Sequence, residues 1–482
     1  MPLGDLGTWT GGGTPSKANA AFWKNGTVPW VSPKDMKVEI IGATEDKVTR
    51  EAVECSSTKY VPEGSVLMVM RSGILRHSFP VAVTDRIVTL NQDLRALTPN
   101  ERVNPNYVAR YLGHASQRVL DECSKDGTTV NSIEALLLER LPVPIAPLAE
   151  QRRIVARVDA LFAEIAEGEA ALAEARKGLE TFRRALLKAA VTGELTKGWR
   201  AANTVGETGQ DALDRMKRDG AARAVSKRRA RRIGDASPRD TSSLPDLPAG
   251  WAWSKLSNLG EFGRGKSRHR PRDDSRLYGG VMPFVQTGVV ANSEDYIRTY
   301  EQTYSELGVE QSRIWPPGTV CITIAANIAK TAITTFECCF PDSIVGLTPV
   351  SPIEPFWVHI WMKTIQQRLE RFAPATAQKN INLEVLETVM VPIPPPAEMV
   401  EILRRVAEAL TASADTLAQL DAESADAARL KQSILKAAFE GRLVPQDPAD
   451  EPASALLARL SDQPTSPRKG RGRGKTRSQM AS

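Results

Sequence analysis

The segment LPVPIAPLAEQRRIVARV, residues 141–158, decides the fold, because it returns as VMVPIPPPAEMVEILRRV at residues 389–406. The start positions differ by 248 (389 − 141). Further on, LLKAAVTGEL at residues 186–195 returns as ILKAAFEGRL at residues 434–443, again shifted by 248 (434 − 186). The stretch between these marks therefore tolerates no net insertion, which indicates a duplicated element of fixed length.

Each copy has the pattern of a long coiled-coil helix. In the first copy, steps of three and four residues connect the seam positions Ile154, Val158, Leu161, Ile165, Leu172, Leu179, Phe182 and Leu186. The second seam is less regular and consists of Ile402, Val406, Leu420, Leu430 and Ile434. One inserted residue would rotate all that follows by about 100° and break the seam, which explains the fixed length.

The ends of these helices are also marked. The first helix is expected to open after Pro147 and to end at the capping glycine Gly193, with Gly441 in the same role in the second copy. A helix of this size spans roughly 65 Å at about 1.5 Å per residue. We expect the two helices to pair with each other; the alternative is two independent amphipathic helices, each packed on its own domain.

Upstream of each helix lies a more variable module. Leu6-Gly7 matches Leu259-Gly260, and runs such as VLMVM at 66–70 and VCITIA at 320–325 have the composition of strands. A proline then opens a helix with aromatic residues four apart, a spacing that favours core packing over base stacking. These aromatic residues are Tyr107 and Tyr111 in the first module and Trp357 and Trp361 in the second.

These patterns predict an α+β protein: two mixed α/β domains in a pseudo-twofold arrangement, separated by two long antiparallel coiled-coil helices. The expected parts are a first domain at 1–145, a first helix at 146–199, a basic linker with a short helix at 200–246, a second domain at 247–393, a second helix at 394–444, and a C-terminal segment with a basic disordered tail at 445–482.

Composition narrows the class of protein. The 482 residues carry a formal net charge of +6, with 41% hydrophobic residues. Basic residues cluster in the linker (223–232), after Gly263, and in the tail (468–477), which suits a polyanionic partner. Neither a membrane span nor a signal peptide is visible, so we expect a cytoplasmic protein without a membrane partner.

No metal site, disulfide framework or catalytic constellation is expected. The five cysteines are an odd number without a C-x-x-C pair, and the four histidines are scattered. GEFGRGKS at 260–267 satisfies the P-loop pattern, but an arginine-rich stretch with a proline follows it instead of an amphipathic helix. NPNY at 104–107 is similar to the N-P-P-Y loop of adenine methyltransferases, but its repeat partner EPFW at 354–357 lacks that chemistry.

Over nearly its whole length the chain resembles the specificity subunits of Type I restriction-modification systems. Any one of the matching stretches is weak, but their duplicated order is specific. They are LPAGWAWSKLSNLG at 247–260, PFVQTG at 283–288, PPGTVCITIAANIAKTAI at 316–333, VPIAPLAEQRR at 143–153 and LKAAFEGRLVPQDPADEPASALL at 435–457. One departure is that no Gly-Trp pair like Gly250-Trp251 stands before Leu3; the segment after Leu443 is a candidate to complete the first module.

The resemblance implies a subunit that is not itself an enzyme. It would bind double-stranded DNA, two methyltransferase subunits that carry S-adenosylmethionine, and two restriction subunits that use ATP and Mg²⁺, with no cofactor of its own. Each module would read one half of a bipartite asymmetric target, while the helices set the gap. Two alternatives stay open: a specificity subunit of a methyltransferase-nuclease fusion complex, and a self-sufficient DNA methyltransferase.

Candidate DNA contacts follow from loop position and residue type. They are Arg264, Lys266, Arg268, Arg270, Asn327 and Lys330 in the second module, and Lys17, Arg71, Arg76 and His77 in the first. The target sequence itself cannot be read from the chain, because base contacts depend on docking geometry.

Overall fold

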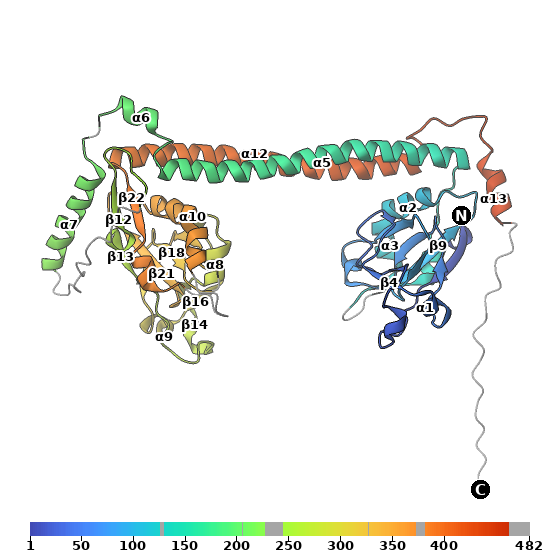
Figure 1. Ribbon diagram of the computed structural model, residues 1–482, viewed down its shortest axis with the longest axis horizontal. Coiled ribbons are helices and arrows are strands. Elements are labelled where there is room, and N and C mark those ends of the chain that lie inside the picture. Colours follow the sequence, from blue (N-terminus) through green and yellow to red (C-terminus); the bar gives the residue numbers. More distant parts are fainter. Residues whose placement is uncertain (126–129, 205, 227–243, 326, 373–380, 462–482) are drawn as a thin grey trace, which may run out of the picture. The chain divides into compact units, whose positions relative to one another are not determined.

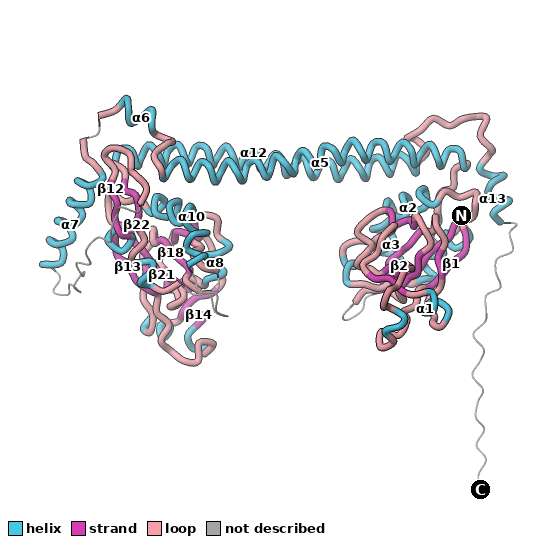
Figure 2. The backbone as a smooth tube through the Cα atoms, in the orientation of Figure 1, coloured by secondary structure: helices cyan, strands magenta, loops and turns pink. Residues whose placement is uncertain are grey.

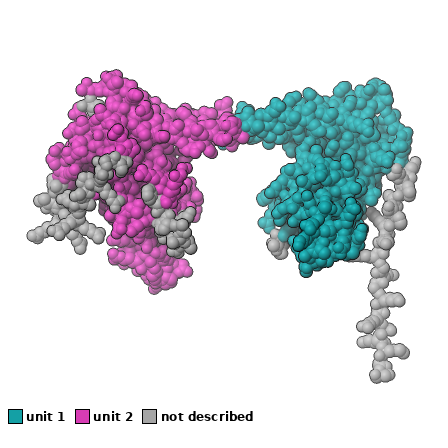
Figure 3. All heavy atoms as spheres, viewed as in Figure 1, with its two compact units in different colours: residues 1–172, 421–482 teal, residues 173–420 magenta. Residues whose placement is uncertain are grey.

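The computed structural model describes the chain except residues 126–129, 205, 227–243, 326, 373–380 and 462–482. The chain forms two compact units, one made of residues 1–172 and 421–482 and the other of residues 173–420 (Figure 3). Each unit contains one mixed α/β domain together with part of both long helices (Figures 1 and 2).

The domain of the first unit contains a five-stranded and a four-stranded sheet, besides the short pair of β10 (Ser124–Lys125) with β11 (Ser132–Ile133). The five-stranded sheet has the order β1 (Gly7–Gly11), β9 (Leu94–Pro99), β6 (Val66–Val69), β7 (Val81–Thr84), β3 (Ile40–Ile41). The four-stranded sheet has the order β4 (Asp46–Val48), β2 (Val28–Val31), β8 (Val88–Leu90), β5 (Tyr60–Val61). Its helices are α1 (Arg50–Glu54), α2 (Pro105–His114), α3 (Ser116–Cys123) and α4 (Ala135–Arg140).

The nine strands of the two larger sheets recur in the same order in the second unit, whose additional two-stranded sheet pairs β12 (Ala252–Lys255) with β22 (Met390–Ile393). Its five-stranded sheet has the order β13 (Gly260–Arg264), β21 (Ile344–Pro349), β18 (Val320–Thr323), β19 (Thr331–Thr334), β15 (Tyr296–Ile297). The four-stranded sheet has the order β16 (Gln302–Tyr304), β14 (Tyr278–Phe284), β20 (Cys338–Cys339), β17 (Ile314–Trp315). The helices are α8 (Thr287–Asn292), α9 (Glu306–Glu310), α10 (Pro355–Phe372) and α11 (Leu383–Glu387). The duplicated unit of the sequence is therefore a whole domain.

Equivalent glycines occupy the first strand of each domain for a steric reason. Gly7 pairs with Pro99 and Gly260 with Pro349 at the same place in their sheets. A Cβ atom would lie 2.1 Å from the carbonyl oxygen of Thr98 at Gly7, and 2.0 Å from that of Thr348 at Gly260. Only glycine lets the two strands approach this closely.

The long helices are α5 (Leu148–Val191) and α12 (Pro396–Phe439), each of 44 residues. Gly193 and Gly441 follow them with φ angles of +74° and +71°. This left-handed conformation ends a helix at low cost only when the residue is glycine, so the expected helix ends are confirmed.

The two helices contact each other in both units. In the first unit, Lys431 Nζ of α12 lies 2.8 Å from the Glu169 carboxylate of α5. In the second unit, the Arg176 guanidinium of α5 donates to the carbonyl oxygen of Leu420 at 3.2 Å. Rising numbers in α5 meet falling numbers in α12, so the helices run antiparallel. The alternative of two independent helices is wrong.

The seam positions differ in burial along the helices. Ile154, Val158, Leu186, Ile402, Val406 and Ile434 are buried, and Leu161, Ile165, Leu172, Leu179 and Leu420 are half-buried. Phe182 and Leu430 are 48% and 51% exposed, which corrects their placement in the buried seam. The two residues occupy equivalent positions of the repeat (430 − 182 = 248). An α-helix has about 3.6 residues per turn and a heptad pattern assumes about 3.5, so the side chains drift away from the heptad face along the helix.

Two further helices attach the remaining segments to the domains. In α7 (Gly209–Ser226), Leu213 and Met216 are buried in the core of the second domain, and this packing makes the helix longer than the short linker helix expected. In α13 (Ala453–Ser461), Leu456 and Leu460 are buried in the core of the first. The basic clusters at 227–232 and 468–477 lie outside the described residues. Within the described residues no helix is long and apolar enough to cross a membrane.

Candidate DNA interface

The ten predicted contact residues fall on two equivalent loops in each domain. Lys17 lies in the loop after β1, and Arg264 to Arg270 lie at the end of β13 and in the loop that follows. Arg71, Arg76 and His77 lie between β6 and β7, and Asn327 and Lys330 between β18 and β19. All ten residues are exposed. Whether they contact DNA stays a prediction.

The loop after β13 has a fixed backbone, although its cations reach solvent. The side-chain oxygen of Gln311 accepts from the backbone N–H groups of Arg268 at 2.5 Å and His269 at 3.1 Å. The Ser312 hydroxyl donates to the carbonyl oxygen of Lys266 at 2.8 Å. These contacts order the loop without using the charged ends of Lys266 and Arg268.

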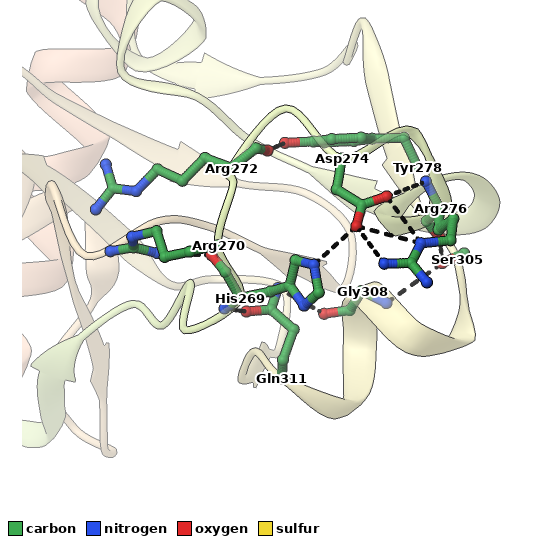
Figure 4. Close-up of polar contacts among 9 residues, drawn as sticks. All are labelled: His269, Arg270, Arg272, Asp274, Arg276, Tyr278, Ser305, Gly308 and Gln311. Atoms are coloured by element: carbon green, nitrogen blue, oxygen red, sulfur yellow. Dashed lines mark hydrogen bonds and ion pairs between the residues drawn. The ribbon is translucent and has the colours of Figure 1, made fainter.

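Asp274 organises the second half of this loop (Figure 4). Its carboxylate lies 2.8 Å from His269 Nε2 and 2.7 Å from the Arg276 guanidinium. Hydrogen bonds from Arg276, followed by that from His269, hold the pKa of Asp274 well below its usual range. In Figure 4 the guanidinium groups of Arg270 and Arg272 point to the opposite side of the loop from this cluster.

The loop keeps an excess of positive charge. Arg272 pairs with Asp342 at 3.0 Å, and Arg276 pairs with Asp274. Within the described part of the chain, no ion pair joins Arg264, Lys266 or Arg268 to a carboxylate. Cations that are exposed and unpaired on an ordered loop are suited to a polyanion.

Lys330 lies beside groups that sequence reasoning missed. It lines a cavity of about 230 Å³ together with Arg183 of α5, Lys363 of α10 and Glu294. Lys363 Nζ lies 2.6 Å from Asp295, and Arg183 forms an ion pair with Glu294. The Arg183 pair ties the domain to α5 within the second unit, whereas the Lys363 pair lies inside the domain. No sequence pattern identified Arg183, because a single arginine on a helix cannot be distinguished by sequence from an ordinary solvent-exposed charged residue.

His359 forms the buried end of this network. The ring is fully buried; Nε2 lies 3.0 Å from Asp295, and Nδ1 lies 3.0 Å from the Thr331 hydroxyl. Burial lowers the pKa of His359 below its ordinary 6.5, although Asp295 acts in the opposite direction. The imidazole is therefore neutral at pH 7.

This neutral histidine predicts acid sensitivity. Below about pH 6.5 the unfolded chain takes up a proton on His359 that the folded chain resists, so stability falls as pH falls. In thermal unfolding between pH 7 and pH 5.5, the midpoint of His359→Gln should drop less than that of the unchanged protein. Equal drops would show that His359 does not contribute to the acid sensitivity.

In the first domain the contact candidates have simpler surroundings. Arg71 pairs with Asp93 at 2.8 Å, while Arg76 and His77 end a short 3-10 helix (Gly73–Arg76). Earlier in the loop that contains Lys17, the carbonyl oxygen of Gly13 accepts from Trp30 Nε1 at 3.0 Å and from the Thr58 hydroxyl at 2.8 Å. Equivalent loops thus present different side chains in the two domains.

The aromatic residues of α2 and α10 belong to the core, as predicted. Tyr107 is 2% exposed and its hydroxyl donates to the carbonyl oxygen of Pro144 at 2.9 Å. At the equivalent place, Trp357 is fully buried and its Nε1 donates to the carbonyl oxygen of Pro392 at 2.8 Å. Two different side chains thus make the same contact in the two domains, each bonding to the segment that leads into the long helix.

Both motifs that were set aside have structural roles. The first five residues of the P-loop pattern form strand β13, which pairs with β21, and not a loop before a helix. In the NPNY segment, the Asn104 side chain caps α2 by accepting from the N–H groups of Asn106 and Tyr107. Among the described residues, no group of three or more His, Cys, Asp or Glu could hold a metal ion.

A buried glutamate fastens the start of the second domain to α12. Glu398 is fully buried and accepts from the Thr196 hydroxyl at 2.7 Å, from Trp251 Nε1 at 2.9 Å and from Arg200. The Trp251 ring also packs edge-on against Trp357, with centroids 5.7 Å apart. The pairing of Glu398 with Glu150 in the repeat was the only sequence signal for this site.

In the first domain a different residue fills the place of Trp251. Phe439, the last residue of α12, packs edge-on against Tyr107 with centroids 5.3 Å apart. Its repeat equivalent in α5 is Val191 (439 − 191 = 248), which is too small for this role. In the first domain, the C-terminal end of α12 thus supplies the aromatic ring that the segment before β12 supplies in the second domain.

Comparisons with known proteins agree on one family. The profile of the Type I restriction modification DNA specificity domain matches residues 1–175 and 248–422. The chain is similar to the EcoR124I/EcoR124II specificity subunit of Escherichia coli, with 39% identity over 188 residues, which cover 38% of this chain and 46% of that protein. It is also similar to the EcoBI specificity subunit of Escherichia coli, with 26% identity and 81% of each chain covered.

The same fold occurs in a solved structure. A chain described under the assembly and conformational transition of the type I restriction-modification system aligns with 92% of this chain and 97% of its own length. The TM-score is 0.66 at 20% sequence identity. This likeness shows a shared fold.

Proposed function

Because the chain belongs to the Type I restriction-modification DNA specificity family, we propose that it reads a bipartite, asymmetric DNA target with one half-site for each domain. It would carry out no chemistry itself. The observation that carries this proposal is the identical order of nine strands in both domains, combined with different residues on the two equivalent loops. One scaffold with two sets of loop side chains fits two different half-sites.

The paired helices support a spacer role. Both have 44 residues, and the 248-residue shift holds across them, which would keep the two readers at a constant separation. Two readers held rigidly favour short DNA elements about one helical turn apart, because both major grooves then face the same side of the duplex.

The chemistry would belong to partner subunits. We propose that the chain recruits two methyltransferase subunits, which bind S-adenosylmethionine and methylate adenine, and two restriction subunits, which use ATP and Mg²⁺. Two observations support assigning the chemistry to partner subunits. The P-loop-like motif forms the strand at residues 260–264, and Asn104 of the methyltransferase-like motif caps a helix, so both motifs have structural roles.

Methylation mapping tests the proposal. The chain is co-expressed with its methyltransferase partner subunit, and modified adenines are mapped in the host DNA. The expected result is a single bipartite motif with a constant gap. Scattered or monopartite methylation would contradict the proposal. S-adenosylmethionine binding by the purified chain in calorimetry would favour the self-sufficient methyltransferase, and a nuclease domain fused to the partner would favour the fusion complex.

The unpaired cations after β13 should contribute affinity more than sequence preference. Lys266→Gln combined with Arg268→Gln should weaken binding of target and unrelated duplexes alike, and lower the slope of log affinity against log salt by about 2 in magnitude. Fluorescence anisotropy between 50 and 200 mM salt, roughly the range in which phosphate contacts are lost, measures both. As a control, Arg276→Gln removes a cation already paired with Asp274 and should change the slope less. Equal slopes for all three proteins would place the phosphate contacts elsewhere.

A further inference from the structure

Strand β14 contains a bulge that pushes one apolar side chain into solvent. Tyr278 and Met282 both face Tyr304 of β16, so the three residues between them, Gly279 to Val281, have no partner in the ladder. Val281 is 94% exposed, whereas no other exposed large hydrophobic residue of the described chain exceeds 64%. Bulges of this kind often re-aim a side chain beside a functional site.

Two neighbouring glycines permit this bulge, which forms where the strand pairs with β16. Gly279 has a φ of +83°, a conformation that other residues adopt only with strain. At Gly280 a Cβ atom would lie 2.3 Å from the carbonyl oxygen of Tyr304. Two glycines in succession thus allow the backbone to turn out and back, and they place Val281 at the exposed point.

The base of the bulge is firmly packed. Phe284 and Tyr304 stack with ring centroids 4.0 Å apart, and Tyr278 lies against Tyr304 at 5.5 Å. Tyr304 is 1% exposed and Phe284 4% exposed. Val281 therefore projects from an ordered aromatic platform, and its exposure is not the result of a loosely held chain end.

The bulge directly follows the basic loop. The Tyr278 hydroxyl donates to the carbonyl oxygen of Arg272 at 2.7 Å, and the Ser305 hydroxyl donates to that of Arg276 (Figure 4). The strand pair that carries Val281 is thus tied to the segment that carries the cations. An apolar point on a strand tied to an arginine-rich loop fits nucleic acid better than a protein surface, since phosphates can bind the cations of the loop while the apolar group meets a base.

We propose that Val281 reads a thymine in the second half-site by contacting its 5-methyl group in the major groove. The proposal rests on the DNA-reading function proposed above. An antiparallel strand pair such as β14 and β16 fits the major groove, and the thymine methyl is the apolar feature displayed there. Valine is too short to act as a wedge between base pairs, a role that longer side chains such as Phe, Leu and Met take.

Deoxyuridine tests this contact, because it differs from thymidine only by the missing methyl group. The complex of the chain with its methyltransferase partner is titrated with duplexes in which each thymine of the second half-site is replaced in turn. One position should weaken binding by the unchanged protein about four-fold, the ratio expected for one buried methyl group. In Val281→Ala the thymine duplex should bind more weakly, and this position should no longer distinguish thymine from deoxyuridine.

Val385→Ala is the matched control. Val385 lies on α11 of the same domain and is also exposed, at 37%. Its variant should retain the four-fold preference. Val281→Ala should keep the thermal midpoint of the unchanged protein, since it removes no buried side chain.

Several outcomes would overturn the inference. They are a second half-site without thymine, equal binding of every deoxyuridine duplex by the unchanged protein, and an undiminished preference in Val281→Ala. Weaker assembly of Val281→Ala with the methyltransferase at unchanged thymine preference would instead assign the bulge to a protein contact. Failure of the unchanged complex to bind any specific duplex would contradict the proposed function itself.

Discussion

Adding one heptad to both α5 and α12 should lengthen the gap of the methylated motif by about three base pairs and leave both half-sites unchanged. Seven residues add about 10.5 Å to a helix, and base pairs are spaced about 3.4 Å apart. A full heptad also keeps the seam facing its partner. The insertions belong after Leu172 and after Leu420, where the two compact units divide the helices.

The control for this experiment is one extra residue at the same two places. It adds almost no length but turns each helix by about 100°, so the seam on one side of the insertion no longer lies on the same face of the helix as the seam on the other side. Contacts within one unit, such as that of Lys431 with Glu169, keep their register, but the seam no longer runs continuously through both units. Methylation should then be lost. If the heptad variant methylates a motif with the original gap, the helices do not set the spacing.

The second large effect is expected at Glu398. Glu398→Ala should lower the free energy of unfolding of the second unit by about 3–5 kcal/mol, because it leaves the Arg200 guanidinium without its partner in a largely buried place. The Trp251 ring nitrogen would lose its acceptor as well. Urea denaturation followed by tryptophan fluorescence measures the change, with the two units analysed as separate transitions.

Glu150→Ala provides the comparison, because Glu150 is the repeat equivalent of Glu398 and is also buried, at 6% exposure. No described side chain donates a hydrogen bond to it, so its loss should cost clearly less. Glu398→Gln should lie between the two, since it keeps the shape and one acceptor but not the charge. Equal losses in Glu398→Ala and Glu150→Ala would show that the donor set around Glu398 adds no stability.

Part of the candidate interface could be predicted and part could not. Residue type and loop position placed all ten contact candidates at exposed positions, nine in loops and Arg264 at the end of β13, because charge and turn residues are readable locally. Arg183, Asp295 and His359 were missed, although the Asp295 carboxylate contacts both of the other two side chains. These three residues lie more than sixty positions apart in the sequence, and no local sequence pattern predicts that their side chains come together.

The long helices show the same division. Their ends and their mutual pairing followed from the heptad steps and from Gly193 and Gly441. The exposure of Phe182 and Leu430 could not be predicted in this way. A heptad pattern identifies the apolar face of a helix, but it does not give the fraction of that face that a single partner helix covers.

By itself the sequence determined the duplicated domain, the two helices of equal length, their ends and the absence of room for insertion. These features rest on identity and periodicity, which are properties of neighbouring residues. Only the tertiary structure decided that Phe439 stands where Trp251 stands in the other domain, that Glu398 gathers three donors, and that Val281 projects from its bulge. Each of these depends on segments far apart in the chain packing together, so the physical reason lies in contacts that no single stretch of sequence contains.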